Sequence, residues 1–171
     1  MKDELGSGFP GFRLSDFTPS CFILFDFLLM PRVDIRLDFS TIQPQLSNIR
    51  INVGGVEFVG SLNSSPLTEK LLRLLPYETY GETWGKEVYF PVDMEVDSHD
   101  LVSEVKVGDI AYWPDGPDIC LFFGRTPKST DDAPVVASPV KVIGTFQFSP
   151  EDFDRIERRR NGILVNVGPA Q

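Results

Sequence analysis

The residue types that could do chemistry in this chain gather in three short aromatic stretches. Their rings are Trp84, Tyr89, Phe90, Tyr112, Trp113, Phe122 and Phe123. Alternate residues of a strand face opposite sides of a sheet, so some of these rings must fill a core and others must face outward. Both tryptophans stand beside glycine or proline turns, where strands end and pockets form. Two interpretations stay open: core packing with a few exposed rings, or an aromatic-lined pocket for an apolar ligand or a proline-containing peptide.

Glu87 is the acidic residue within this aromatic set, between Trp84 and Tyr89. If its carboxyl group faces the mouth of the fold, it could hold a polar group of a ligand. An exposed surface position is the more ordinary place for a glutamate, and it is the one we expect. The candidate ligand-binding residues are therefore Trp84, Glu87, Tyr89, Tyr112, Trp113, Phe122 and Phe123.

Histidine and cysteine, the usual metal ligands and nucleophiles, are scarce. The chain has one histidine, His99, which excludes metal sites that need two or three and argues against Ser-His or Cys-His catalysis. Cys21 and Cys120 are too widely spaced for a CxxC pair, and Cys120 lies in an apolar run that predicts a buried thiol. Acidic residues of the loop at 91–100 could bind a hard cation, but their spacing is not that of a calcium loop. We predict no metal site and no cofactor.

Composition limits the partners. The 171 residues suffice for one domain with a tail, and 42% of them are hydrophobic, which is enough for a core. The net charge of −9 opposes binding to the phosphates of nucleic acids and to anionic membranes. We therefore predict no nucleic-acid and no membrane partner, and take the charge as a source of solubility.

Residues 1–47 lack the periodicity of the rest of the chain. Their apolar run at 21–30 is interrupted by Asp26 and is far shorter than the ~20 residues of a spanning helix. Acidic residues follow Lys2 at once, so a signal peptide is a poor match and the cytoplasm is the expected location. Three interpretations stay open: a disordered extension, an extra element packed on the domain, or a true start at Met30.

Regular patterning begins at Asn48. Residues 49–53 and 56–59 alternate between apolar and polar, and Gly54-Gly55 between them predicts a hairpin turn. Turn signals separate the remaining strand patterns. These further strands are predicted over residues 77–83, 87–90, 109–113, 119–123, 140–148 and 163–167.

Two helices are predicted. Ser65 can cap the first, Pro66 suits its first position and Pro76 ends it. The second begins at residues 149–150 and would end in the arginines at 158–160, where cations suit the negative end of a helix. Seven or eight short strands with two helices indicate a barrel or sandwich with helices at its ends.

Three stretches carry a resemblance to a known family: residues 83–90 (TWGKEVYF), 108–116 (GDIAYWPDG) and 122–127 (FFGRTP). In this order and at this spacing they resemble the small prokaryotic cyclophilin-like proteins, a family of largely unknown function. The resemblance covers residues 48–167. It implies a mainly β fold, a closed β-barrel of about eight strands with two helices.

The resemblance implies little about activity. The family shares its barrel with the peptidyl-prolyl isomerases, but the Phe-His-Arg and Gln-Gly-Gly-Asp stretches of true cyclophilins are not found in this chain. Arg125 stands where the family pattern usually has a proline. On a rim, its guanidinium group could stabilise the carbonyl oxygen while an X-Pro bond rotates, which makes it the one catalytic candidate. The alternative is a solvated loop arginine.

Together these observations predict an N-terminal extension over residues 1–47 and a cyclophilin-like barrel domain over residues 48–171. Three functions stay open for the domain. It is a binding module with an aromatic-lined pocket for a peptide or small apolar ligand, a weak or atypical prolyl isomerase, or a structural, homo-oligomer-forming domain whose exposed aromatic rings form the interface.

Overall fold

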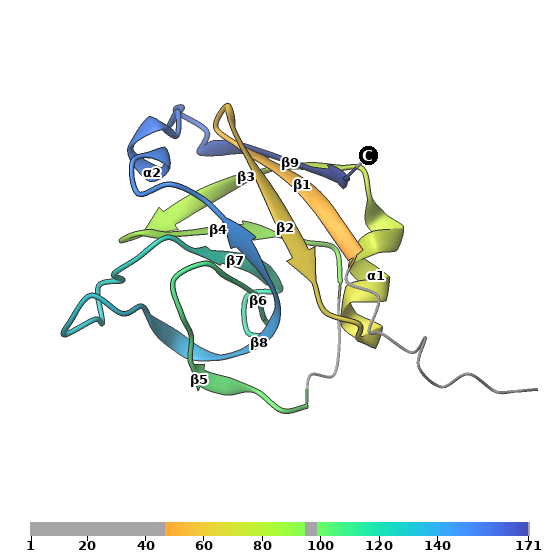
Figure 1. Cartoon of the computed structure of the whole chain (residues 1–171), viewed down its shortest axis with the longest axis horizontal. Coiled ribbons are helices and arrows are strands. Elements are labelled where there is room, and N and C mark those ends of the chain that lie inside the picture. Colours follow the sequence, from red (N-terminus) through yellow and green to blue (C-terminus); the bar gives the residue numbers. More distant parts are fainter. Residues whose placement is uncertain (1–46, 95–98, 171) are drawn as a thin grey trace, which may run out of the picture. The chain divides into compact units, whose positions relative to one another are not determined.

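The hairpin predicted from the alternating pattern is present. In the computed structural model, which describes residues 47–94 and 99–170, β1 (Ser47–Val53) pairs antiparallel with β2 (Val56–Leu62). Gly54 and Gly55 have φ angles of 54° and 87°, the left-handed values that a two-residue hairpin turn requires. The interpretations of residues 1–46 lie outside the described residues (Figure 1).

The predicted strands are all found, with small shifts of their bounds. β8 begins earlier than predicted and runs through Pro139, which is tolerated because residues at that end pair only with β5 on one side. The short strand β5 was not predicted. The remaining elements are β3 (Tyr77–Trp84), β4 (Glu87–Pro91), β5 (Val102–Glu104), β6 (Asp109–Trp113), β7 (Asp118–Phe122), β8 (Val135–Gln147) and β9 (Ile163–Pro169).

The strands close into a ring, as Figure 1 shows. Their order is β2-β1-β9-β3-β4-β7-β6-β8, and β2 also pairs with β8, with Val59 opposite Gln147 and Leu62 opposite Gly144. The two strands approach closely there, since a side chain at Gly144 would meet the carbonyl oxygen of Ser61. The chain therefore has the mainly β, closed eight-stranded fold that was expected, and β5 adds to β8 beside the ring.

The first helix, α1 (Pro66–Leu74), follows the prediction. The Ser65 hydroxyl accepts a hydrogen bond from the Thr68 N–H at 3.2 Å, and the Thr68 hydroxyl accepts one from the Ser65 N–H at 2.9 Å. This reciprocal pair is a capping box in which threonine takes the place of the usual glutamate. Leu67 and Leu71 of the predicted leucine stripe are buried, so the stripe packs on the core.

The second helix was predicted too long. α2 (Asp152–Arg155) has four residues, and the arginines at 158–160 lie beyond it. After the helix the chain turns extended at Ile156, whose side chain is buried, and the Glu157 N–H donates to the Gly54 carbonyl at 2.9 Å. The burial of Ile156 and this bond to the distant hairpin end the helix before residues 158–160, where the sequence pattern had predicted its end.

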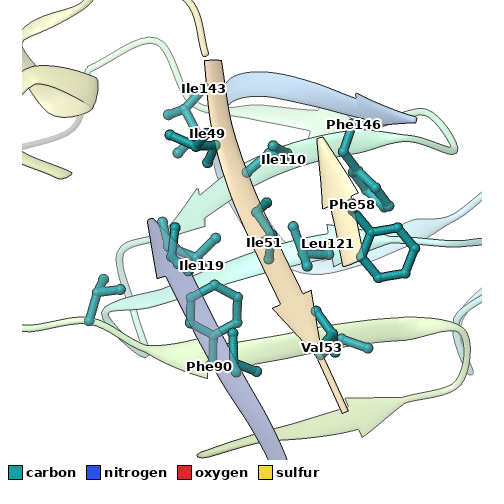
Figure 2. Close-up of a cluster of buried hydrophobic side chains, with 14 of the residues drawn as sticks. Ile49, Ile51, Val53, Phe58, Phe90, Ile110, Ile119, Leu121, Ile143 and Phe146 are labelled. Atoms are coloured by element: carbon teal, nitrogen blue, oxygen red, sulfur yellow. The ribbon is translucent and has the colours of Figure 1, made fainter. Parts of the chain in front are cut away.

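Two apolar clusters lie on opposite sides of the sheet. The larger fills the ring, and Figure 2 shows some of its side chains converging from several strands. The smaller cluster takes alternate residues of the same strands, so it lies on the outer face of β6, β7 and β8. β7 serves both, which explains why all its residues are buried. The outer cluster consists of Val105, Ala111, Cys120, Phe122, Val136 and Val140, with Tyr89, Trp113 and Val142 packed against it.

Candidate functional site

A partly open cavity of about 170 Å³ lies on the outer face of the ring, over the outer cluster. Strand pairing fixes its walls, because Glu87 pairs with Trp84 on β3 and with Phe122 on β7, and Tyr89 pairs with Cys120. β8 supplies the opposite wall. The lining residues are Trp84, Glu87, Tyr89, Trp113, Cys120, Phe122, Val136, Ala137, Ser138 and Val140.

Five of the seven predicted ligand-binding residues line this cavity, and two do not. Tyr112 is 1% exposed in the inner core, where its hydroxyl donates to the Met94 carbonyl at 2.7 Å. Phe123 packs in the same core, with its ring centroid 4.9 Å from that of Phe146. Each of these two residues follows or precedes a ring that lines the cavity, Trp113 or Phe122, and neighbouring residues of an extended chain face opposite sides.

Glu87, one of the candidate ligand-binding residues, is not on the exposed surface where a glutamate was expected. Its side chain lines the cavity and the residue is only 6% exposed. Burial raises the pKa of this carboxyl above its ordinary value of 4.5, and the nearby Asp118 raises it further, against a hydrogen bond from the Cys120 thiol that lowers it. Burial and Glu87 also raise the pKa of the Cys120 thiol, which disfavours the thiolate form that a nucleophilic cysteine needs.

The aromatic walls are held by hydrogen bonds. The Trp113 Nε1–H donates to the Ser138 hydroxyl at 2.6 Å, and that hydroxyl donates to the Asp115 carboxylate at 2.7 Å. The Tyr89 hydroxyl donates to the Glu82 carboxylate at 3.0 Å. Burial and this bond raise the pKa of Tyr89 to about 12, so the phenol remains protonated at any physiological pH.

Two more carboxylates lie close to Glu87 or Tyr89. Asp118, 7% exposed, pairs with Trp113 on β6, and Glu82 on β3 is exposed. Burial, followed by the charge of Glu82, raises the pKa of Asp118. Within the described part of the chain none of these three carboxylates forms an ion pair with lysine or arginine. The site therefore combines aromatic walls with uncompensated acidic groups.

Arg125, the catalytic candidate, does not line the cavity. It is exposed, and its guanidinium group donates to the Ser129 carbonyl at 3.4 Å. Its own carbonyl accepts from the Lys86 N–H at 2.7 Å, which fixes the loop against the turn between β3 and β4. This placement corresponds to the solvated loop arginine of the alternative interpretation.

Sequence reasoning missed half of the lining residues: Cys120, Val136, Ala137, Ser138 and Val140. A signal existed for Cys120, which shares a strand face with Phe122 two positions on. None existed for Val136, Ala137 and Ser138, because the predicted strand began only at residue 140.

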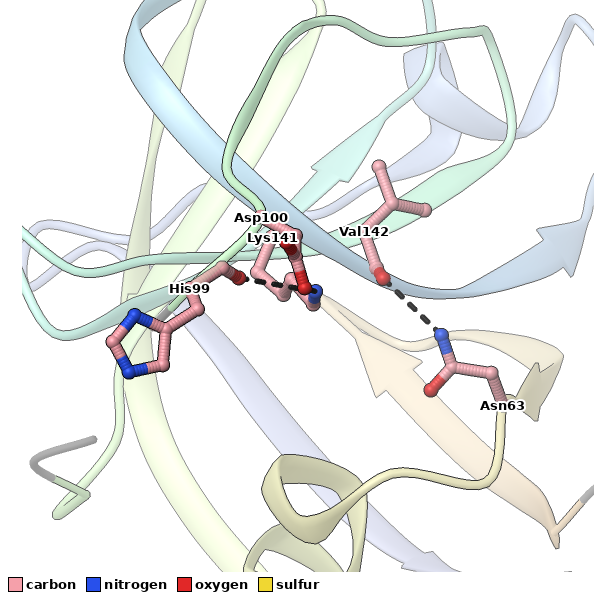
Figure 3. Close-up of polar contacts among 5 residues, drawn as sticks. All are labelled: Asn63, His99, Asp100, Lys141 and Val142. Atoms are coloured by element: carbon pink, nitrogen blue, oxygen red, sulfur yellow. Dashed lines mark hydrogen bonds and ion pairs between the residues drawn. The ribbon is translucent and has the colours of Figure 1, made fainter. Parts of the chain in front are cut away.

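The acidic loop after β4 shows no metal site within the described residues. There, no three His, Cys, Asp or Glu side chains gather closely enough to hold an ion. The Lys141 ammonium instead donates to the His99 carbonyl at 3.1 Å and to the Asp100 carboxylate at 3.4 Å, beside the bond from Asn63 to the Val142 carbonyl (Figure 3). Residues 95–98 of this loop lie outside the described part.

The comparisons with known proteins agree with this fold. The Cyclophilin-like family model matches residues 47–165, so the chain belongs to the cyclophilin-like family. It is similar to the solution structure of a hypothetical protein from Archaeoglobus fulgidus, with 31% identity and a TM-score of 0.60 over 76% of this chain and 99% of that one. No curated protein matches the chain. In the described residues no helix is long and apolar enough to cross a membrane.

Proposed function

We propose that the domain from residue 48 onward is a binding module, and that the outer-face cavity takes a small apolar ligand or an apolar side chain of a peptide. The observation that carries this proposal is the wall of four aromatic rings, Trp84, Tyr89, Trp113 and Phe122, around about 170 Å³ of space. An apolar cavity of roughly 150 Å³ is large enough to bind benzene. Pockets for small ligands combine such walls with a few polar groups, here Glu87 and Ser138.

The test uses the two tryptophans of the chain, which both line the cavity. Intrinsic tryptophan fluorescence of the full-length protein therefore reports on this site alone. Small aromatic compounds and a proline-containing peptide are titrated against wild type, Ala137→Phe and Ala133→Phe. Ala137 lines the cavity, whereas Ala133 is exposed in the loop before β8 and is not among the lining residues.

We expect saturable fluorescence changes in wild type and Ala133→Phe and a loss of binding in Ala137→Phe. Binding that survives Ala137→Phe unchanged, or no binding of any probe by folded protein, would refute the proposal. The atypical isomerase and the oligomer-forming domain lack a comparable observation, since Arg125 is exposed outside the lining and Tyr80 is the one aromatic residue with substantial exposure in the described part.

A further inference from the structure

The cavity contains a buried acid that has no ion pair with a lysine or arginine among the described residues. Glu87 lines the cavity, and only 6% of the residue is exposed to solvent. The Cys120 thiol is its hydrogen-bonding partner. A thiol is a weak donor, and no lysine or arginine of the described chain pairs with this carboxyl. Buried carboxylates ordinarily have a cationic or strongly hydrogen-bonding partner.

The surrounding charges have the same sign. Asp118 and Glu82 approach the site from β7 and β3, and Asp115 is held at the rim by Ser138. Lys128 is an exposed basic residue near the rim, where its ammonium group donates to the Ala137 carbonyl at 2.7 Å. The whole chain adds a net charge of −9. The field at the cavity therefore attracts cations.

We propose that the cavity binds an organic cation with an alkylated ammonium head, its carbon groups against the aromatic walls and its charge beside Glu87. This inference rests on the proposed function, because it names the ligand class of the same cavity. Aromatic faces attract such a cation, and cages of aromatic rings are the usual way to bind alkylated ammonium ions. A metal ion does not suit these walls, since rings supply no oxygen or nitrogen ligands.

A cationic ligand would account for the buried carboxyl group of Glu87, whereas an uncharged apolar ligand would not. A neutral ligand would cover Glu87 and increase the cost of its burial, whereas an ammonium ion would compensate the carboxylate. Burial raises the pKa of Glu87, so the carboxyl ionises less readily in the empty cavity than in water, and a nearby cation would favour its ionised form. The facing groups Tyr89 and Cys120 stay protonated, while Asp118 and Glu82 add negative charge. Cation affinity should therefore rise with pH.

The experiment compares choline with its neutral tert-butyl analogue, in which carbon replaces the ammonium nitrogen. Both are titrated into full-length protein by tryptophan fluorescence and calorimetry, at several pH values. The variants are Glu87→Gln, which keeps the shape and removes the charge, and Glu78→Gln, a control at an exposed residue of β3. We expect choline to bind about tenfold more tightly than the analogue, a preference that Glu87→Gln abolishes and Glu78→Gln retains.

The outcomes separate this inference from the binding module itself. If the neutral analogue binds as tightly as choline, the cation proposal is wrong and the binding module stands. If aromatic probes bind and choline does not, the result is the same. If no probe binds at all, both proposals fail. A peptide carrying trimethyllysine, tested beside its unmethylated form, shows whether a side chain or a free small molecule is the better source of the head group.

Discussion

The indole of Trp113 and the hydroxyl of Ser138 join β6 to β8 across the rim of the cavity, with a donor–acceptor distance of 2.6 Å. Because the same hydroxyl donates to Asp115, it cannot rotate away without losing a second bond. The Trp113 wall is therefore set in place before any ligand arrives. Preorganisation of this kind lowers the entropic cost of binding.

Ser138→Ala tests this arrangement. The variant leaves the half-buried indole N–H without its acceptor, so we expect it to unfold about 1 kcal/mol more easily in urea and to bind cavity probes more weakly. Ser138→Thr retains a hydroxyl and should restore both properties in part. Unchanged binding and stability in Ser138→Ala would show that the bond does not hold the wall.

Glu87→Gln should alter the dependence of stability on pH. The pKa of Glu87 is higher in the folded protein than its ordinary value of 4.5, which applies to the unfolded chain. The stability that this difference contributes is fully present below pH 4.5 and is lost as the pH rises through the folded-state pKa. At neutral pH the variant, which cannot ionise, should therefore be more stable than wild type. The difference should disappear in acid.

Urea unfolding of both proteins over a pH series measures this effect, with Glu78→Gln as the control at an exposed site. Asp118 raises the pKa of Glu87, so the difference between wild type and variant includes this repulsion between the two carboxyls. A Glu87→Gln protein that is less stable than wild type at neutral pH would mean that the ionised carboxyl has a stabilising partner.

Phe123→Ala should separate the inner core from the cavity. The Phe123 ring packs against Phe58, Phe146, Phe148 and Phe153 inside the fold, so the variant should lose about 3–5 kcal/mol of unfolding free energy. Binding by the protein that remains folded should be unchanged. Denaturant unfolding and fluorescence titration are the measurements; Phe123→Leu, which leaves a smaller void, serves if the alanine variant does not fold. A binding defect in folded Phe123→Leu would place the residue in the site after all.

Arg125→Ala should have little effect on the stability of the protein or on its binding of cavity probes. The side chain is exposed and makes one long bond to a loop carbonyl, so we expect a stability change within about 0.5 kcal/mol and normal probe binding. The same protein is assayed for cis–trans isomerisation of a short X-Pro peptide. Catalysis by wild type that Arg125→Ala loses would restore the isomerase interpretation.

Most strands and the first helix could be predicted from the sequence because their signals are local, whereas the closed barrel was implied by the family resemblance. The alternation around Gly54-Gly55 and the cap at Ser65 each depend on a few neighbouring residues. The end of α2 could not be predicted, since it depends on a bond from Glu157 to the distant hairpin. The existence of a strand or helix thus follows from a short stretch of sequence. The residue at which it ends depends on contacts with other elements.

The site could be predicted only in part for a related reason. Alternation shows that Tyr112 and Trp113 must face opposite ways, but which of them faces inward depends on how the ring closes. Closure pairs β2 with β8, two strands far apart in the chain. The burial of Glu87 could not be predicted either, because it comes from β8 and the outer cluster rather than from its own strand.

Closure of the ring has a consequence for how partners can be recognised. Each of its eight strands is paired with a neighbour on both sides over part of its length, so along those paired segments no main-chain edge is free for an extended peptide to add as a further strand. Selectivity along those segments must then reside in side chains on the outer face. The cavity can accordingly be given new preferences by exchanging wall residues, while the main-chain bonds that hold the ring together stay as they are.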